Sequence, residues 1–153
     1  MRGSLGHLPA ILLVEDDPAE VRLLQEVFTA LPVRTQLHVA RDGREALAFL
    51  RHEAPYLHAP RPALILFSLK LPGLSGHQLL AVLKRDPALR PIPALVFTNS
   101  VSPQHIQQSY ELGANSYLLK PFEFTQLVEM VHVIVVYWLQ VVTPPPPLCP
   151  RHP

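Results

Sequence analysis

The chain has 153 residues, one cysteine and a formal net charge of +1. This length predicts a single domain with a hydrophobic core of its own. Thirteen basic and twelve acidic residues nearly cancel, so we expect no nucleic-acid partner, because such partners select strongly basic surfaces. The single cysteine, Cys149, excludes an internal disulfide and suits a reducing cytoplasm.

The apolar run over residues 127–142 raises the question of a membrane. It is shorter than the ~20 apolar residues of a spanning helix. Glu129, His132 and Gln140 also interrupt it. The first nine residues contain no long apolar stretch, so we expect no signal peptide. The chain is therefore predicted to be cytoplasmic, without a membrane partner.

Strand-like and helix-like segments alternate from residue 10 onward. Ala10–Val14 is a continuous apolar run that ends at acids, as a buried parallel strand does. Asp17 and Pro18 mark the start of a helix, the first as its cap and the second in its first turn. Residues 35–40 predict a second strand, and an Asp-Gly turn leads into a helix over 43–50.

The second half of the chain continues the alternation in three further strand–helix pairs. These are strand 63–67 with helix 75–84, strand 93–97 with helix 102–112, and strand 116–119 with helix 123–140. Five such pairs predict a parallel sheet with helices on both faces. We expect the folded domain to cover residues 9–142. Residues 1–8 are predicted to be disordered or tag-like, and residues 143–153 to form a proline-rich tail.

Polar residues follow four of the predicted strands at their carboxyl ends. Open parallel sheets bind ligands at that edge. The residues are Glu15 and Asp16 after the first strand, Ser68 after the third, Thr98 after the fourth and Lys120 after the fifth. Each alone is a weak signal, since such residues also cap helices or lie in loops. Together they predict one polar site.

This order of motifs resembles the receiver domain of two-component response regulators, over about residues 9–140. The motifs are Glu15-Asp16-Asp17, the segment from Ser68 to Gly73, Thr98, and Lys120-Pro121. The resemblance implies a (βα)5, flavodoxin-like, three-layer α/β/α fold with strand order 2-1-3-4-5. It also implies a signalling protein, rather than an enzyme, whose partner is a sensor histidine kinase.

The resemblance implies a role for each of the matched positions. Acids at the positions of Glu15 and Asp16 help to hold Mg²⁺ in the family. Thr98 and Tyr117 match the residues that respond to phosphate, and Lys120 matches the lysine that pairs with the acceptor. Pro121 matches the loop position where a cis peptide is a candidate.

The phospho-acceptor aspartate of the family is replaced here by Ser68. A serine hydroxyl is a weak nucleophile without an activating base, and it removes one anionic metal ligand. Lys70 brings a positive charge to the same loop. Its ammonium group either points to solvent or lies among Glu15 and Asp16 in place of a cation. We therefore expect no cofactor, and weak or absent Mg²⁺ binding.

The last predicted helix is apolar on nearly every side, so its outer side needs a cover. Its run of apolar and aromatic residues before a proline-containing tail resembles the single-domain regulators that partner phytochromes. That resemblance implies dimerisation through the last strand–helix face and the C-terminal extension. The predicted interface residues are Val131, Ile134, Val135, Tyr137 and Trp138.

Three functional hypotheses remain open from the sequence. The first is a pseudo-receiver that acts by protein–protein interaction and dimerisation without phosphorylation. The second is an ordinary phospho-accepting regulator of a phytochrome-type kinase whose acceptor aspartate has been substituted at Ser68. The third is an enzymatic role for Ser68, which needs a base that only Glu15 and Asp16 could supply.

Overall fold

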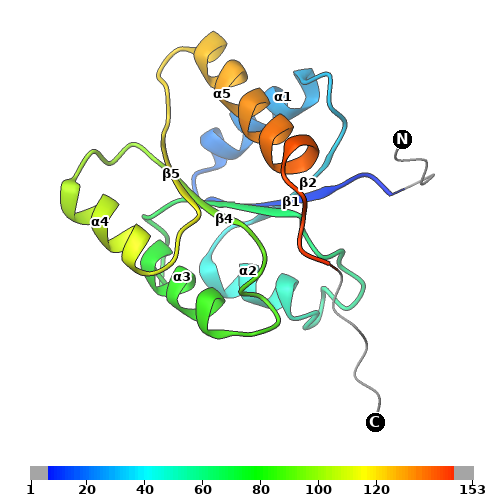
Figure 1. Cartoon of the computed structure of the whole chain (residues 1–153), viewed down its shortest axis with the longest axis vertical. Coiled ribbons are helices and arrows are strands. Elements are labelled where there is room, and N and C mark those ends of the chain that lie inside the picture. The colour runs from blue at the N-terminus through cyan, green and yellow to red at the C-terminus, as the bar shows by residue number, and fades with distance from the viewer. Residues whose placement is uncertain (1–6, 147–153) are drawn as a thin grey trace.

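Five parallel strands form one sheet in the order β2-β1-β3-β4-β5, as expected (Figure 1). The computed structural model describes residues 7–146. The strands are β1 (Ala10–Val14), β2 (Gln36–Ala40), β3 (Leu64–Phe67), β4 (Ala94–Thr98) and β5 (Ser116–Leu119). The predicted α/β class and strand order are confirmed, and each strand lies within two residues of its expected bounds.

Helices cover both faces of the sheet (Figure 1). They are α1 (Pro18–Ala30), α2 (Gly43–Leu50), α3 (Gly76–Arg85), α4 (Pro103–Glu111) and α5 (Phe124–Val136), followed by the π-helical turn η1 (Tyr137–Val141). Figure 1 shows α1 and α5 on one side of the sheet and α2, α3 and α4 on the other. This arrangement is the three-layer α/β/α fold that five strand–helix pairs predict.

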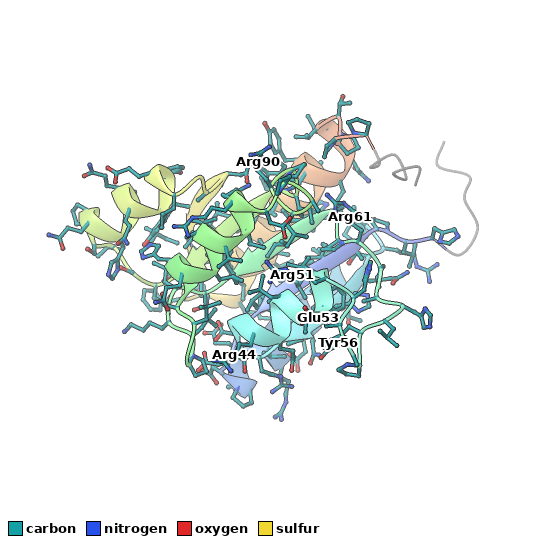
Figure 2. The ribbon with its side chains drawn as sticks, turned by 90° about the horizontal axis from the view of Figure 1, so that it is seen from below. Arg44, Arg51, Glu53, Tyr56, Arg61 and Arg90 are labelled. Carbon is teal, nitrogen blue, oxygen red and sulfur yellow. The ribbon has the colours of Figure 1, made fainter. Side chains whose placement is uncertain are left out.

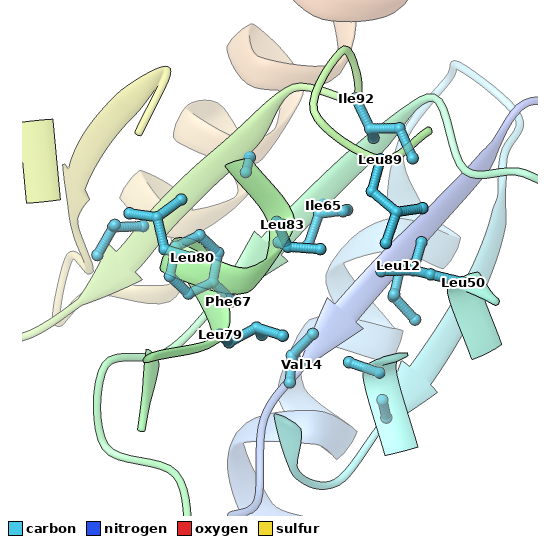
Figure 3. Packing of buried hydrophobic residues seen from close by; sticks show 14 of the residues in the cluster. Leu12, Val14, Leu50, Ile65, Phe67, Leu79, Leu80, Leu83, Leu89 and Ile92 are labelled. Carbon is cyan, nitrogen blue, oxygen red and sulfur yellow. The ribbon is translucent and has the colours of Figure 1, made fainter. Parts of the chain in front are cut away.

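Alternating side chains of the central strands fill two separate cores. Leu12, Ile65 and Phe67 face α2 and α3, where they pack with Leu79 and Leu80 (Figure 3). Their sequence neighbours face the opposite way and pack against α1 and α5. All four residues of β3 are buried, because the strand lies in the middle of the sheet with a helical layer on each face.

Polar caps fix where the helices begin. Asp17 accepts a hydrogen bond of 2.9 Å from the Ala19 amide at the start of α1, as predicted. Ser75 and Gln78 form a reciprocal capping box at the start of α3. Both caps stand directly after a loop that leaves the carboxyl edge of the sheet. They therefore set the direction of the loops that surround the predicted site.

Arginines are spread across the face formed by α2, α3 and the loop between α2 and β3. Figure 2 shows Arg44, Arg51, Arg61 and Arg90 apart from one another on this face. Arg51 is also paired with Asp86 at 3.5 Å. A groove that follows a phosphate backbone needs its cations side by side, so this face gives no support to nucleic-acid binding.

The C-terminal helix differs from its expected form at its end. Regular α-helix stops at Val136, and the next five residues form a π-helical turn closed by a 2.8 Å bond from the Val142 amide to the Tyr137 carbonyl. The sequence carries no sign of this change, because the run is apolar on nearly every side and no single spacing stands out.

The window Phe124–Val141 has the length and mean hydropathy, 1.4, of a possible membrane span. However, α5 packs on the sheet through Leu127 and Val131.

Three of the predicted interface residues are core residues of their own chain. Val131, Ile134 and Val135 are 4% exposed or less, so the prediction that they line a dimer interface is wrong. The reason is that α5 uses this side to cover the sheet. Tyr137 is 49% exposed, so it remains available for contact with a second copy of the chain. Trp138 is half-buried against the α1–α5 core.

The proline-rich tail follows η1 (Figure 1) and lies beside the residues that precede β3 and β4. Pro144, Pro145 and Pro146 line a shallow cavity together with Arg61–Ala63 and residues 92–93. The predictions for residues 1–6 and 147–153, including that for Cys149, lie outside the described residues.

Candidate functional site

The strand register brings the predicted site residues together at the carboxyl edge. Val14 pairs with Phe67, so Glu15 and Ser68 follow at the same level of neighbouring strands. The Ser68 amide donates to the Val14 carbonyl at 3.1 Å. Thr98 is the last residue of β4, and its carbonyl accepts from the Lys120 amide at 2.9 Å. Four segments that are distant in sequence thus meet at one place.

A cavity of about 320 Å³ opens at this edge. Lysines, hydroxyl side chains, an asparagine and a histidine dominate its lining. The lining residues are Ser68, Leu69, Lys70, Thr98, Asn99, Ser100, His105 and Lys120. Four of these, Ser68, Lys70, Thr98 and Lys120, were predicted from the sequence. None of the lining residues carries a carboxylate.

The Lys120 ammonium group is held by two glutamates. Its Nζ lies 3.0 Å from Glu15 Oε1 and 3.6 Å from Glu20 Oε2. It also lies 5.6 Å from the centre of the Phe97 ring. The side chains of Lys120 and Glu15 are 9% and 5% exposed, so each compensates the buried charge of the other. The sequence did not indicate Glu20 as a partner of this lysine.

The acids present do not form a good magnesium site. Glu15 already accepts from Lys120 and, through Oε2, from the Asp17 amide at 3.1 Å. Asp16 is exposed, and Asp17 caps α1. Among residues 7–146, no group of three or more His, Cys, Asp or Glu side chains could hold a metal ion. Mg²⁺ prefers several oxygen ligands, with carboxylates among them, whereas Ser68 brings a neutral hydroxyl to the cavity.

Lys70 lies at the rim of the cavity and is exposed. The ion pairs found within the described part of the chain join Arg51 to Asp86 and Lys120 to Glu15 and Glu20. The inward alternative, with the Lys70 ammonium among Glu15 and Asp16, is therefore not what the structure contains. Lys120 occupies that place, and Lys70 contributes its charge to the mouth of the cavity.

Hydrogen bonds join the loop between β4 and α4 to β5. Thr98 is buried, and its hydroxyl oxygen accepts from the Ser100 amide at 3.2 Å. The Tyr117 hydroxyl donates to the Ser100 carbonyl at 2.9 Å. The Tyr117 amide donates to the Tyr110 hydroxyl of α4 at 3.2 Å. The two predicted switch residues, Thr98 and Tyr117, therefore both hold Ser100 in place.

The comparisons with known proteins agree with this geometry. A model of the response regulator receiver domain matches residues 11–132. Response regulator Rcp1 of Synechocystis sp. is 43% identical over 135 residues, which covers 88% of this chain and 92% of Rcp1.

The chain belongs to the response regulator receiver family.

Solved structures of two receivers are also similar to this receiver. The crystal structure of the phosphorylated cyanobacterial phytochrome response regulator RcpA has a TM-score of 0.85 at 40% identity, and the match covers 92% of this chain and all of RcpA. The Mn²⁺-bound form of Rcp1 has a TM-score of 0.82 at 42% identity, with 90% of this chain and 99% of Rcp1 covered. Response regulators of this family act in two-component signal transduction.

The predicted cis peptide at Pro121 is not found in this receiver. The cis bond among the described residues precedes Pro55 instead, so the prediction for Pro121 is wrong. Any X–Pro bond prefers trans by only about 0.5–1 kcal/mol, so its isomer is set by tertiary contacts that a sequence does not display.

Two histidines beside the cavity of this receiver were missed by sequence reasoning. Ser100 Oγ and His105 Nδ1 share a hydrogen bond of 2.6 Å, and the His77 and His105 rings lie 5.9 Å apart. Ser109, which is fully buried, donates its hydroxyl proton to the His105 carbonyl at 2.7 Å. The Ser109 oxygen must therefore accept the 2.9 Å bond from His77 Nε2. The only available signal was the position of His105, three residues after the Ser102 cap.

His77 is expected to make the stability of this receiver depend on pH. Burial lowers the pKa of His77 below its ordinary value of 6.5. Below pH 6.5 the unfolded chain therefore takes up a proton that the folded chain still excludes, and stability falls as the pH falls. Urea unfolding between pH 7.5 and about 5 should show a steeper loss for the wild type than for His77→Gln. His58→Gln, which replaces an exposed histidine in the loop after α2, is the matched control, and equal slopes for His77→Gln and the wild type would contradict the assignment to His77.

Proposed function

We propose that this receiver is a pseudo-receiver, which signals through protein–protein contacts without becoming phosphorylated. The observation that carries the proposal is Ser68, which stands at the end of β3 in a cavity whose lining contains no carboxylate. A phosphoryl group transferred by the family's route needs an anionic acceptor and a metal that shields the incoming charge. In this chain residue 68 has no anionic group to accept the phosphoryl group. The side chains around it are also unfavourable ligands for a metal ion, so that route has no support.

The partner we infer is a sensor histidine kinase of the phytochrome type in the cytoplasm. RcpA is described as a phytochrome response regulator, and the similarity of the two chains over nearly their whole lengths supports a partner of the same kind. Thr98 and Lys120 line the cavity, and Tyr117 is bonded to Ser100 beside it; all three have the residue types that the resemblance to the family implies. The kinase can therefore meet a surface of ordinary receiver shape that does not take its phosphate.

A second candidate is an ordinary phospho-accepting regulator that has a substituted acceptor. The retained Thr98, Tyr117 and Lys120 favour it, because a single change at residue 68 would then account for the loss. Lys70 counts against it, since it is a second departure in the same loop. An enzymatic role for Ser68 has less support, because the nearby imidazole of His105 is bonded to Ser100.

The test of the proposal is labelling of the unmodified chain with a small phosphodonor such as acetyl phosphate in the presence of Mg²⁺. We expect no acyl phosphate, measured as a mass increase that is lost on treatment with hydroxylamine. A known receiver treated in parallel shows that the donor is active. Stoichiometric, hydroxylamine-sensitive labelling of this chain would overturn the pseudo-receiver proposal.

We further propose that two copies of the chain associate through β5, α5 and η1. Large exposed apolar side chains gather on this part of the molecule: Leu119, Phe122, Phe124, Val133, Tyr137 and Val141 are 42–98% exposed. Exposed apolar groups that are contiguous favour an interface, because water contact with them is unfavourable. The outward residues named here replace the three core residues that the sequence had suggested.

Val133→Glu is expected to shift the chain from dimer to monomer. Val133 is 66% exposed on α5, and a buried unpaired carboxylate at an interface is costly. Sedimentation equilibrium should give a dissociation constant at least tenfold weaker than for the wild type. Leu57→Glu is the matched control, because Leu57 is 60% exposed on the loop after α2. The dimer proposal is wrong if the wild type is already monomeric at micromolar concentration, or if both variants dissociate equally.

A further inference from the structure

A second cavity lies at the amino edge of the sheet, opposite the edge that carries Ser68. The segment before β1, the loop between α1 and β2, and η1 bound it, and we call it the amino-edge cavity. Its volume is about 470 Å³, against about 320 Å³ for the cavity beside Ser68. Its lining is formed by Leu8, Pro9, Val33, Arg34, Leu139 and Gln140, with His7 beside them. Small-molecule sites have volumes of roughly 300–1,000 Å³ and a mostly apolar lining, so this cavity has the size of one.

The apolar part of the lining is continuous with the core between the sheet and helices α1 and α5. Val33 and Leu139 are partly buried and pack against that core. Leu8 is 38% exposed and adds a further apolar side chain. Removing apolar carbon from water is favourable in proportion to the area covered. These side chains therefore favour a ligand with an apolar body.

The polar part of the lining carries positive charge and no carboxylate. Arg34 is exposed and makes no ion pair within residues 7–146. A guanidinium group presents its N–H donors in a fork that matches the two oxygens of a carboxylate. The side-chain amide of Gln140 adds a neutral donor to the same lining. The polar groups therefore complement a single carboxylate.

The walls of the amino-edge cavity are held in place without a ligand. The Pro9 carbonyl accepts from the Gln36 amide at 2.9 Å, which ties the segment before β1 to the start of β2. The 2.8 Å bond from the Val142 amide to the Tyr137 carbonyl closes η1 and fixes the wall that it contributes. Single π-helical turns are rare and are frequent at functional sites. A cavity that is already formed loses little conformational entropy when it binds.

We infer that the amino-edge cavity binds a small monocarboxylate with an apolar body, such as a medium-chain acyl carboxylate. The carboxylate pairs with Arg34 and accepts from Gln140, and the apolar chain lies on Val33 and Leu139. No covalent bond forms or breaks. The inference goes beyond the proposed signalling role and is independent of Ser68, because the two cavities lie at opposite edges of the sheet.

Amide chemical shifts provide the test. The ¹⁵N-labelled full chain is titrated with decanoate, kept below the concentration at which it forms micelles. We expect saturable shifts at the amides of Leu8, Val33, Arg34, Leu139 and Gln140. Octanoate, which is two methylene groups shorter, should bind roughly tenfold more weakly, because less apolar surface is buried.

The role of the charge is tested by changing it on each side of the contact. Arg34→Gln should weaken decanoate binding roughly threefold to tenfold, as expected for one partly solvated charge pair. 1-Decanol, which has the same chain without the charge, should bind the wild type and Arg34→Gln equally. Arg44→Gln is the matched control, because it removes an exposed cation from α2 on the other face of the sheet and should leave decanoate binding unchanged.

Three outcomes would overturn the inference. Shifts that do not saturate, or that centre on the exposed side of α5 around Val133, mean non-specific binding to apolar surface. Equal weakening in Arg34→Gln and Arg44→Gln means that no charge pair forms in the cavity. Shifts of the lining amides that follow protein concentration without any ligand mean that a second copy of the chain covers the cavity. Because phosphorylation is measured separately by mass, each of these failures leaves the pseudo-receiver proposal standing.

Discussion

Ser68→Asp combined with Lys70→Asn is expected to be labelled by acetyl phosphate in the presence of Mg²⁺, whereas the unmodified chain is not. The first change supplies the carboxylate that can accept the phosphoryl group. It also adds an anionic oxygen ligand beside Glu15 and Asp16, which a hard cation requires. The second change removes an ammonium group from the rim of the cavity, where it competes with a metal ion.

The rate of labelling separates the contribution of residue 68 from that of residue 70. Ser68→Asp alone should be labelled weakly. Adding Lys70→Asn should raise the labelling rate roughly fivefold, because one partly solvated charge near a cation site contributes about 1 kcal/mol. Acyl phosphate is measured by intact mass before and after hydroxylamine. Ser68→Asn, which has nearly the shape of the aspartate variant but no nucleophilic oxygen, is the matched control and should remain unlabelled.

Each contrary outcome has a distinct meaning. Equal labelling of the single and double variants would show that Lys70 does not hinder phosphorylation, and would favour an ordinary receiver with one substituted residue. No labelling of either variant would show that the cavity has departed from an active receiver at further positions. Labelling of Ser68→Asn would show that the phosphate is attached elsewhere in the chain.

Gly76→Ala is expected to lower the free energy of unfolding by about 2–3 kcal/mol, near the upper end of the usual cost of overpacking. A methyl group at residue 76 would overlap the Ser68 carbonyl oxygen and lie 2.7 Å from Leu69 Cα. Both contacts are with backbone, so neither can be relieved by rotating a side chain. The Gly76 amide also donates to the Leu69 carbonyl at 2.9 Å. The loop that carries Ser68 and Lys70 would therefore have to move.

Gly73→Ala is the comparison that separates crowding from backbone strain. Gly73 has φ of +72° and nothing within 4 Å of the added methyl group, so only its left-handed conformation is penalised, by about 1 kcal/mol. Urea unfolding at constant pH gives both values. A loss at Gly76→Ala no larger than that at Gly73→Ala would contradict the close approach of α3 to the strand end.

Much of the fold could be predicted because local chemistry and the global arrangement agree. The apolar run Ala10–Val14, the Asp17 cap and the Asp-Gly turn before residue 43 each mark an element boundary within a few residues of where it lies. Five such pairs leave few arrangements other than a parallel sheet covered on both faces. The candidate site followed from the same logic, because the carboxyl ends of parallel strands meet at one edge. Ser68, Thr98 and Lys120 therefore meet around one cavity, as predicted.

The amino-acid sequence by itself was enough to predict a receiver and to propose Ser68 as the residue at the acceptor position, since both depend only on residue types in order. Tertiary structure decided which charges meet. It pairs Lys120 with Glu15 and Glu20, leaves Lys70 at the rim, and brings His105 to Ser100 beside the cavity. It also buries Val131 and leaves Val133 exposed on the same helix. The physical reason is that pairing and burial depend on distances between segments far apart in sequence, which local patterns do not contain.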